Sequence, residues 1–279
     1  MPIAAAASPK RAQYARGMLF PELEGHPGAS VVLLHAHPDD ETLATGGLMA
    51  RLVADGCRVV LVTGTRGERG EVVPGPLKSL EGTPELAGVR VTELAAAMHA
   101  LGVADHRFLG AGASTEAHSA RAVGSAPRIY ADSGMQWGPD GTAVAADDAP
   151  FDALSLAPID EIVDDILVVV RDVAPRLLVS YDERGGYGHP DHVRMHDAAV
   201  AVSKATGIPL YRVVADWDGD APFGGSDVVV PLGPQRASKF AALAAHSTQL
   251  TVDGGDIVLS GGQRHTVADT EVFRRFPTL

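Results

Sequence analysis

The chain has 279 residues, enough for one large α/β domain or two small ones with a sizeable core. Hydrophobic residues make up 46% of the chain and charged residues 21%, as in ordinary globular proteins. The formal net charge of -12 argues against nucleic acid and anionic membranes as partners, because both would be repelled. We also find no apolar stretch of about 18 residues that could span a membrane. The oligomeric state is left open.

The only cysteine is Cys57, so no intramolecular disulfide can form. This fits a reducing compartment, and we expect a cytoplasmic protein in which Cys57 is a buried, inert thiol. Residues 1–28 lack the pattern of a secretory signal. We expect them to be a weakly specified leader, at most partly ordered against the domain that follows.

From residue 30 onward, strand and helix patterns alternate. Residues 30–36 are a short, β-rich apolar run typical of a buried strand. Residues 42–54 carry an apolar stripe at helical spacing, and residues 57–63 predict a second strand. This order of strand, helix and strand is that of a parallel βαβ unit.

The same rhythm continues along the chain. Helices are predicted over 89–101, 158–173, 191–206 and 234–246, and strands over 106–109, 176–181, 210–215 and 227–230. We therefore predict a single α/β domain over residues 29–279. It should have a Rossmann-like, mostly parallel sheet flanked by helices, with a smaller elaboration of strands and loops near the C-terminus.

Residues 110–157 interrupt this rhythm. They are rich in Gly, Ala, Ser and Asp and show little periodicity, which predicts a long loop. A second loop of this kind covers residues 216–225. Each loop holds a tryptophan, Trp137 or Trp217, that could form a sugar-stacking wall or pack on the domain edge. Whether the loop over 110–157 closes over a substrate is open.

The first motif with catalytic potential is His37-Pro38-Asp39-Asp40-Glu41. It stands where a predicted strand ends and a helix begins, the edge at which open α/β sheets bind ligands. His37 offers a neutral imidazole and Asp40 a hard oxygen, and a turn into a helix could point both at one ion. Asp39 need not ligate and could act as a general base on a water molecule.

The second motif, Tyr187-Gly188-His189-Pro190-Asp191-His192, also follows a predicted strand and opens a helix. Both motifs should therefore lie on the same edge of the sheet. His192 would complete a set of two imidazoles and one carboxylate with an open position, the pattern of a catalytic zinc. A single His-Pro-Asp more often marks a capped turn, but two of them after strands favour a metal site.

With both motifs, the sequence resembles the LmbE-like (PIG-L) family of zinc-dependent N-acetylglucosaminyl deacetylases. The resemblance covers roughly residues 30–275. Within the family it points to the mycothiol-pathway branch, through four further segments: Tyr181-Asp182, Gly185 to His192, Asp132 to Met135, and Ala245 to Gln249. In this resemblance, His37, Asp40 and His192 match the metal ligands and Asp39 matches the general base.

The resemblance implies roles for five other residues. His189 would stabilise the tetrahedral oxyanion and could protonate the leaving amine, Asp191 would orient His189, and Tyr187 would assist at the oxyanion. Arg90 and Asp132 match positions that hold sugar and inositol hydroxyls. Protons could be handled by Asp39 alone or by Asp39 and His189 together.

The implied reaction is hydrolysis of the acetamide of an N-acetylglucosaminyl-inositol, which releases acetate and the free amino sugar. The cofactor would be Zn²⁺, although Fe²⁺ could use the same ligands. The alternative substrate is a mycothiol S-conjugate or another N-acetyl amino sugar. Gly188 favours the deacetylase over the S-conjugate amidase.

Other classes of protein fit the sequence less well. Two histidines and a carboxylate also form the facial triad of non-haem iron oxygenases, but those ligands usually sit on all-β scaffolds. Gly64, Gly67 and Gly70 have the wrong spacing for a dinucleotide fingerprint, and the lysine of a phosphate loop is missing. The nucleophile elbow of a serine hydrolase is also absent.

Overall fold

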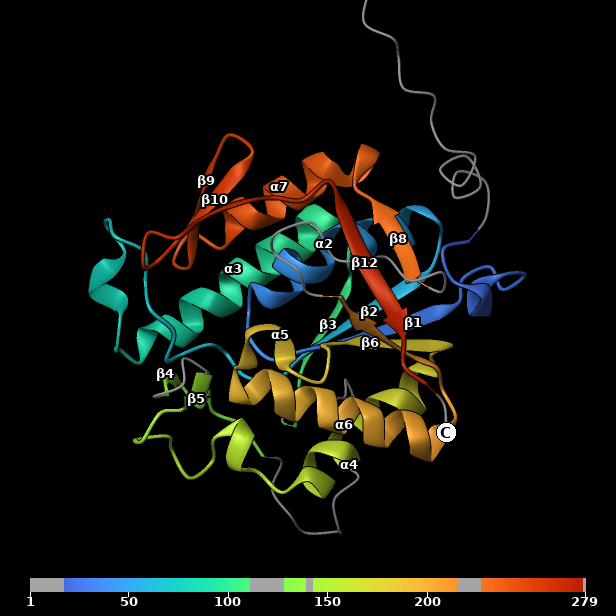
Figure 1. Ribbon diagram of the computed structural model, residues 1–279, viewed down its shortest axis with the longest axis horizontal. Helices are drawn as coiled ribbons and strands as arrows, with labels where there is room; N and C mark the ends of the chain where they lie inside the picture. The colour runs from blue at the N-terminus through green and yellow to red at the C-terminus, as the bar shows by residue number, and fades with distance from the viewer. Residues whose placement is uncertain (1–17, 111–127, 139–142, 215–226, 278–279) are drawn as a thin grey trace, which may run out of the picture.

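The centre of the molecule is a twisted sheet with helices on both faces (Figure 1). The structure, a computed structural model, describes residues 18–110, 128–138, 143–214 and 227–277. In these residues the main sheet has the strand order β3-β2-β1-β6-β7-β12-β8. Its strands are β1 (Ser30–His35), β2 (Arg58–Thr63), β3 (Asp105–Phe108), β6 (Leu177–Ser180), β7 (Leu210–Val213), β8 (Asp227–Pro231) and β12 (Thr270–Arg275).

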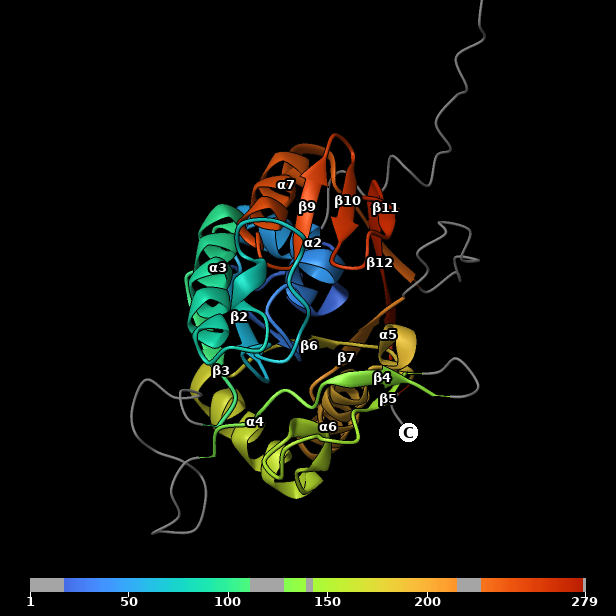
Figure 2. The same ribbon diagram turned by 90° about the vertical axis from the view of Figure 1, so that its left-hand side faces the viewer.

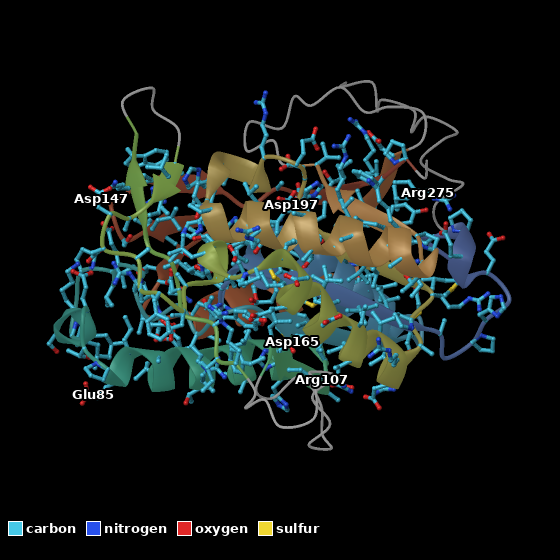
Figure 3. All side chains as sticks on the ribbon, turned by 90° about the horizontal axis from the view of Figure 1, so that it is seen from below. Glu85, Arg107, Asp147, Asp165, Asp197 and Arg275 are labelled. Atoms are coloured by element: carbon cyan, nitrogen blue, oxygen red, sulfur yellow. The ribbon has the colours of Figure 1, made fainter. Side chains whose placement is uncertain are left out.

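Each face of the sheet is covered by its own group of helices. One group is α2 (Asp40–Ala54), α3 (Glu85–Leu101) and α7 (Arg236–Ala245), and the other is α4 (Ile159–Val173) and α6 (Pro190–Thr206). Figure 3 is seen from the side of the second group, with Asp165 labelled on α4 and Asp197 on α6. Shorter elements are α5 (Gly185–Gly188) and the 3-10 turns η1 (Pro21–Leu23), η2 (Lys78–Leu80), η3 (Leu154–Leu156) and η4 (Gly233–Gln235).

Strand β1 shows why the sheet has two cores. Val31 and Leu33 belong to the core under α2 and α3, whereas Val32 and Leu34 belong to the core under α4 and α6. Successive side chains of a strand point to opposite faces, so a strand that is apolar throughout must be covered on both sides. Each fully buried aliphatic side chain contributes roughly 1.5–3 kcal/mol.

The parallel strands place a ligand-binding edge beside β1. Strand β1 pairs in parallel with β2 on one side and with β6 on the other. The chain therefore moves outward from β1 to β2 and β3, and later returns to the opposite side of β1 through β6. Such a reversal of strand order opens a crevice at the carboxyl ends of the two strands.

The predicted α/β fold is confirmed, with differences at particular elements. Helix α3 begins at Glu85, four residues before the expected start. Strand β12 inserts antiparallel between β7 and β8, and the sequence did not predict it. The expected C-terminal elaboration is a small sheet beside α7 (Figure 2), made of β9 (Leu250–Asp253), β10 (Asp256–Leu259) and β11 (Arg264–Thr266).

The described parts of the expected leader and of the first expected loop have ordered structure. Phe20 and Leu23 are fully buried in the core, which agrees with a leader that is partly ordered against the domain. The domain boundary at residue 29 stays a prediction. The segment 110–157 contains a hairpin of β4 (Met135–Trp137) and β5 (Ala143–Ala145) in place of a plain loop. Residues 1–17, 111–127, 139–142 and 215–226, which include Trp217, lie outside the described residues.

None of the helices in the described part of the chain has both the length and the apolar character that crossing a bilayer would require.

Candidate active site

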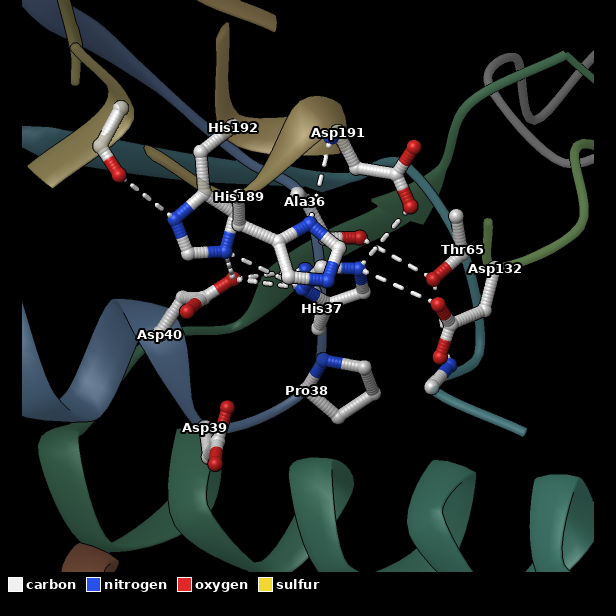
Figure 4. A network of polar contacts seen from close by, with 12 residues as sticks. Ala36, His37, Pro38, Asp39, Asp40, Thr65, Asp132, His189, Asp191 and His192 are labelled. Atoms are coloured by element: carbon white, nitrogen blue, oxygen red, sulfur yellow. Dashed lines mark hydrogen bonds and ion pairs between the residues drawn. The ribbon is translucent and has the colours of Figure 1, made fainter. Parts of the chain in front are cut away.

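The two His/Asp motifs meet at one edge of the central sheet. The first follows the end of β1 into α2, and the second follows the end of β6, through α5, into α6. Because β1 and β6 are neighbours, the motifs come together as the sequence predicted. Figure 4 shows His37, Asp40 and His192 turned toward one another at this edge.

Three atoms of these residues form a nearly equilateral triangle, here called the ligand triangle. Asp40 Oδ2 lies 3.3 Å from His37 Nδ1 and 3.2 Å from His192 Nε2, and the two nitrogens are 3.2 Å apart. A tetrahedral ion with ligands at about 2.05 Å needs its ligand atoms about 3.3 Å apart. In spacing and in donor type, the three residues fit a small divalent ion.

The outer nitrogen of each imidazole is already hydrogen-bonded. His192 Nδ1 lies 3.0 Å from the carbonyl oxygen of Gly185, and His37 Nε2 lies 3.1 Å from Asp191 Oδ2. Both partners accept, so these two ring nitrogens carry the protons. When the rings are neutral, the lone pairs of His37 Nδ1 and His192 Nε2 are thereby directed into the ligand triangle. Burial lowers the pKa of His37, but the carboxylates of Asp132, Asp191 and Asp40 raise it well above its usual value, so a metal ion would bind at Nδ1 in place of a proton. Outer hydrogen bonds of this kind orient metal-binding histidines.

The carboxylate of Asp40 is held by two donors. The backbone N–H of His37 donates to Oδ2 at 2.8 Å, and the hydroxyl of Tyr181 donates to the same oxygen at 2.7 Å. Burial alone would raise the pKa of Asp40, but His192 and His37 hold it well below its usual value. Asp40 is therefore anionic, as a metal-binding carboxylate has to be. Tyr181 also stacks its ring on His192, with ring centroids 4.3 Å apart.

Asp191 is hydrogen-bonded to both His37 and His189. Its carboxylate accepts from His37 Nε2, and from the backbone N–H (3.0 Å) and the hydroxyl of Ser133. Its backbone N–H donates to His189 Nδ1 at 3.2 Å. The structure thus brings Asp191 and His189 into contact through the backbone of Asp191, while its carboxylate binds His37 and Ser133. That Asp191 orients His189 stays a prediction.

His189 packs against the ligand triangle as a neutral ring. Its imidazole makes an edge contact with His37 at 4.5 Å between centroids and stacks near His192 at 4.9 Å. Burial, together with the charges of His37 and His192, lowers its pKa far below the usual value. Because Nδ1 accepts from the Asp191 N–H, the proton of the neutral ring is on Nε2.

Tyr187 lies at the rim of the site. Its side chain is 47% exposed, and its ring contacts His192 at 5.2 Å and His189 at 6.1 Å between centroids. It belongs to α5, whose flanking glycines Gly185 and Gly188 both have positive φ. A half-exposed phenol beside two imidazoles can reach toward a substrate without displacing a buried contact.

Asp39 directly precedes Asp40 in the chain. In Figure 4, no dashed line joins Asp39 to His37, Asp40 or His192. Burial and the neighbouring charge of Asp40 raise its pKa to about 7. A carboxylate with a pKa near neutrality is suited to general-base catalysis. Its backbone has φ 112°, which is rare for a residue with a side chain.

Arg90 and Asp132 both lie next to the site but are engaged by the protein. Arg90 is 2% exposed and donates to the carbonyls of Gly67, Gly70 and Glu71. Asp132 Oδ1 lies 3.7 Å from His37 Nε2 and also accepts from the N–H of Gly134. A role of Arg90 or Asp132 in sugar binding stays a prediction.

The sequence analysis assigns no role to two residues that contact the site. Tyr181 donates to Asp40 and Ser133 donates to Asp191, and the sequence marks both only as parts of family-like segments. Their positions directly after β6 and beside Asp132 were the available signal. By contrast, His196 binds the carbonyl of Tyr181 at 2.8 Å from Nδ1 and contacts none of the triangle atoms in the described residues.

The chain matches known deacetylases in sequence over most of its length. It is 38% identical to a 1D-myo-inositol 2-acetamido-2-deoxy-alpha-D-glucopyranoside deacetylase of Geodermatophilus obscurus, over 89% of this chain and 92% of the relative. A protein of the same name from Kineococcus radiotolerans is 40% identical over 80% of this chain and 69% of the relative.

Solved structures share the fold. The N,N'-diacetylchitobiose deacetylase of Pyrococcus horikoshii matches with a TM-score of 0.59 and 18% identity, over 99% of this chain and 95% of that one. A deacetylase of teicoplanin biosynthesis matches with a TM-score of 0.59 and 22% identity, over 90% of this chain and all of that one.

The family model for GlcNAc-PI de-N-acetylase (PIG-L) matches residues 32–203, a span that contains the whole ligand triangle. With relatives of 35–40% identity along most of the chain, this match decides the family. The chain belongs to the GlcNAc-PI de-N-acetylase family.

Proposed function

We propose that this protein is a Zn²⁺-dependent N-deacetylase of 1D-myo-inositol 2-acetamido-2-deoxy-α-D-glucopyranoside. The products would be acetate and the free amino sugar. The observation that carries the proposal is the ligand triangle of His37, Asp40 and His192, with Asp39 and His189 beside it. The substrate is suggested by the names of the relatives.

The ligand set supports a metal-assisted hydrolysis. A zinc ion held by two imidazoles and one carboxylate supplies a Lewis acid that activates water and polarises the amide carbonyl. Fe²⁺ fits the same donors, so the metal itself needs measurement. Neutral imidazoles and an anionic Asp40 are the protonation states that such binding requires.

Asp39 and His189 would handle charge and protons during the reaction. Asp39, with its pKa near 7, would accept the proton of the attacking water. The N–H of Asp191 donates to His189 Nδ1, so the proton of the neutral ring is on Nε2. His189 would donate a hydrogen bond from Nε2 to the developing oxyanion. Tyr187, half-exposed at the rim, would add a second donor. The C–N bond then breaks, and the amine leaves with the proton that Asp39 took from the water, because a neutral His189 has no acidic proton to give.

The test is an assay of the zinc-loaded full chain for release of free amine. The substrates would be the N-acetylglucosaminyl-inositol, plain N-acetylglucosamine and a mycothiol S-conjugate, each with and without a chelator. We expect chelator-sensitive turnover with preference for the inositol glycoside. Preference for the S-conjugate would keep the chemistry and change the substrate. No turnover of any of them, with zinc demonstrably bound, would refute the proposal.

A further inference from the structure

Asp39 has a backbone conformation that needs support. Its φ of 112° and ψ of -35° lie outside the regions that residues with a side chain normally occupy. Such conformations persist only where surrounding contacts hold them, and they gather at functional sites. The contacts on either side of Asp39 therefore bear on where its carboxylate points.

Both polar groups of the peptide unit between Pro38 and Asp39 are bound by side chains. The carbonyl of Pro38 accepts from Gln249 Nε2 at 2.7 Å, and the N–H of Asp39 donates to Glu41 Oε2 at 3.0 Å. Gln249 comes from the turn that follows α7, and Glu41 from the first turn of α2. The plane of this peptide is thus fixed from two directions.

Glu41 is itself held in place. It is fully buried, and its other carboxylate oxygen lies 3.0 Å from His246 Nε2 and accepts from the hydroxyl of Thr42. His246 and Gln249 belong to one turn, closed by a bond from Gln249 N–H to His246 O at 2.9 Å. The described contacts of Glu41, His246 and Gln249 include none with an atom of the ligand triangle.

We propose that Glu41 and Gln249 are positioning residues for Asp39, with His246 fixing Glu41. Together they clamp the Pro38–Asp39 peptide and so aim the Asp39 carboxylate beside the ligand Asp40. This inference rests on the proposed function, in which Asp39 is the base. In the described residues, the clamp acts on Asp39 through its peptide group and not through the atoms of the ligand triangle.

The test compares Glu41→Ala and Gln249→Ala in the zinc-loaded full chain. Because misplacing a reacting group by about 1 Å can cost about 10²-fold in rate, we expect kcat to fall about 10²-fold in each. KM and bound zinc should stay at the wild-type values. Glu41→Gln should regain kcat to within about tenfold, since an amide oxygen still accepts from the Asp39 N–H.

Glu271→Ala is the matched control. Glu271 is also a buried glutamate that accepts backbone N–H groups of α2, from Gly47 and Leu48, both at 2.7 Å, but it does not bind residues 37–41. This variant should lose thermal stability and keep kcat. If Glu41→Ala does not fold, Gln249→Ala, which removes a single neutral donor, decides the question.

A second readout does not depend on activity. In ¹⁵N-labelled protein, the Asp39 amide proton should exchange slowly with solvent, and Glu41→Ala should remove that protection. If the wild type hydrolyses no acetamide while this protection is lost in the variant, the proposed function fails and the clamp stands. If the wild type is active and both alanine variants keep kcat, or lose it only together with zinc, the clamp is refuted.

Discussion

Substitution of Asp39 tests whether this residue acts in catalysis or binds the metal. Its neighbour Asp40 is a vertex of the ligand triangle, while Asp39 is half-buried with a pKa raised to about 7. We expect Asp39→Asn to lower kcat by about 10²–10⁴-fold, the usual share of a general base, with bound zinc unchanged. Steady-state kinetics and metal analysis of the same samples would check this. Loss of zinc would make Asp39 a ligand instead.

Asp191 should affect metal binding, because its carboxylate binds the imidazole nitrogen of His37 that faces away from the ligand triangle. The bond from His37 Nε2 to Asp191 Oδ2 directs the opposite nitrogen into the triangle. Removing such an outer partner typically costs 10–100-fold in metal affinity, and we expect Asp191→Asn to do so. Competition with a chromogenic chelator measures it. Asp165→Asn, on α4 outside the site, should leave the affinity unchanged; an equal loss there would contradict a specific role.

At the scale of elements, the junction of α5 and α6 depends on a glycine. Gly185 has φ 61°, and a Cβ there would lie 2.6 Å from the Cβ of His192. We expect Gly185→Ala to displace His192, weaken zinc binding and destabilise the fold by more than the roughly 1–2 kcal/mol of a left-handed alanine. Gly207, at the end of α6, has φ 72° with nothing within 4 Å of its Cβ position. Gly207→Ala should show the backbone cost alone, with zinc affinity intact.

Local patterns explain which elements were predictable. Strands β1, β2 and β6 are mostly apolar runs. Helix α6 begins at Pro190 and is capped by Gly207 after its last residue, Thr206, so each of these elements is marked within its own sequence. Strand β12 reads Thr-Glu-Val-Phe-Arg-Arg and is mostly polar at its ends. Its place between β7 and β8 depends on long-range pairing, which no local pattern reports.

The contacts of the site also include some that the sequence predicts and some that it does not. The ligand triangle could be predicted because both motifs are short and directly follow adjacent parallel strands. The partner of Asp191 could not, since Ser133 comes from the irregular segment after residue 127 and meets α6 only in the folded chain. The clamp on Asp39 joins residues more than 200 positions apart, as the separation of Pro38 and Gln249 shows.

For the whole molecule, a buried ion pair joins β12 to α7, and the same lysine also hydrogen-bonds to α2. Lys239 on α7 donates to Glu271 on β12 at 2.7 Å and to the carbonyl of Leu43 at 2.8 Å. Lys239→Met would leave the buried Glu271 carboxylate without its cationic partner, and we expect a loss of about 3–5 kcal/mol in urea unfolding. Lys78→Met, which breaks an exposed pair with Glu81, should cost about 0–1 kcal/mol. Equal losses would contradict this difference.

Metal binding should also be visible in the stability of the whole chain. His37 and His192 are 155 positions apart, so an ion between them joins the β1–α2 and β6–α6 units. A ligand that binds only the folded state stabilises it by about 2.7 kcal/mol at 100 times its Kd. We therefore expect Tm to rise with zinc and to fall on chelation. His192→Ala should abolish this dependence and Asp39→Asn should preserve it, because only the first removes a vertex of the triangle. If zinc does not change the Tm of the wild type, the ligand triangle does not hold the ion in the folded protein.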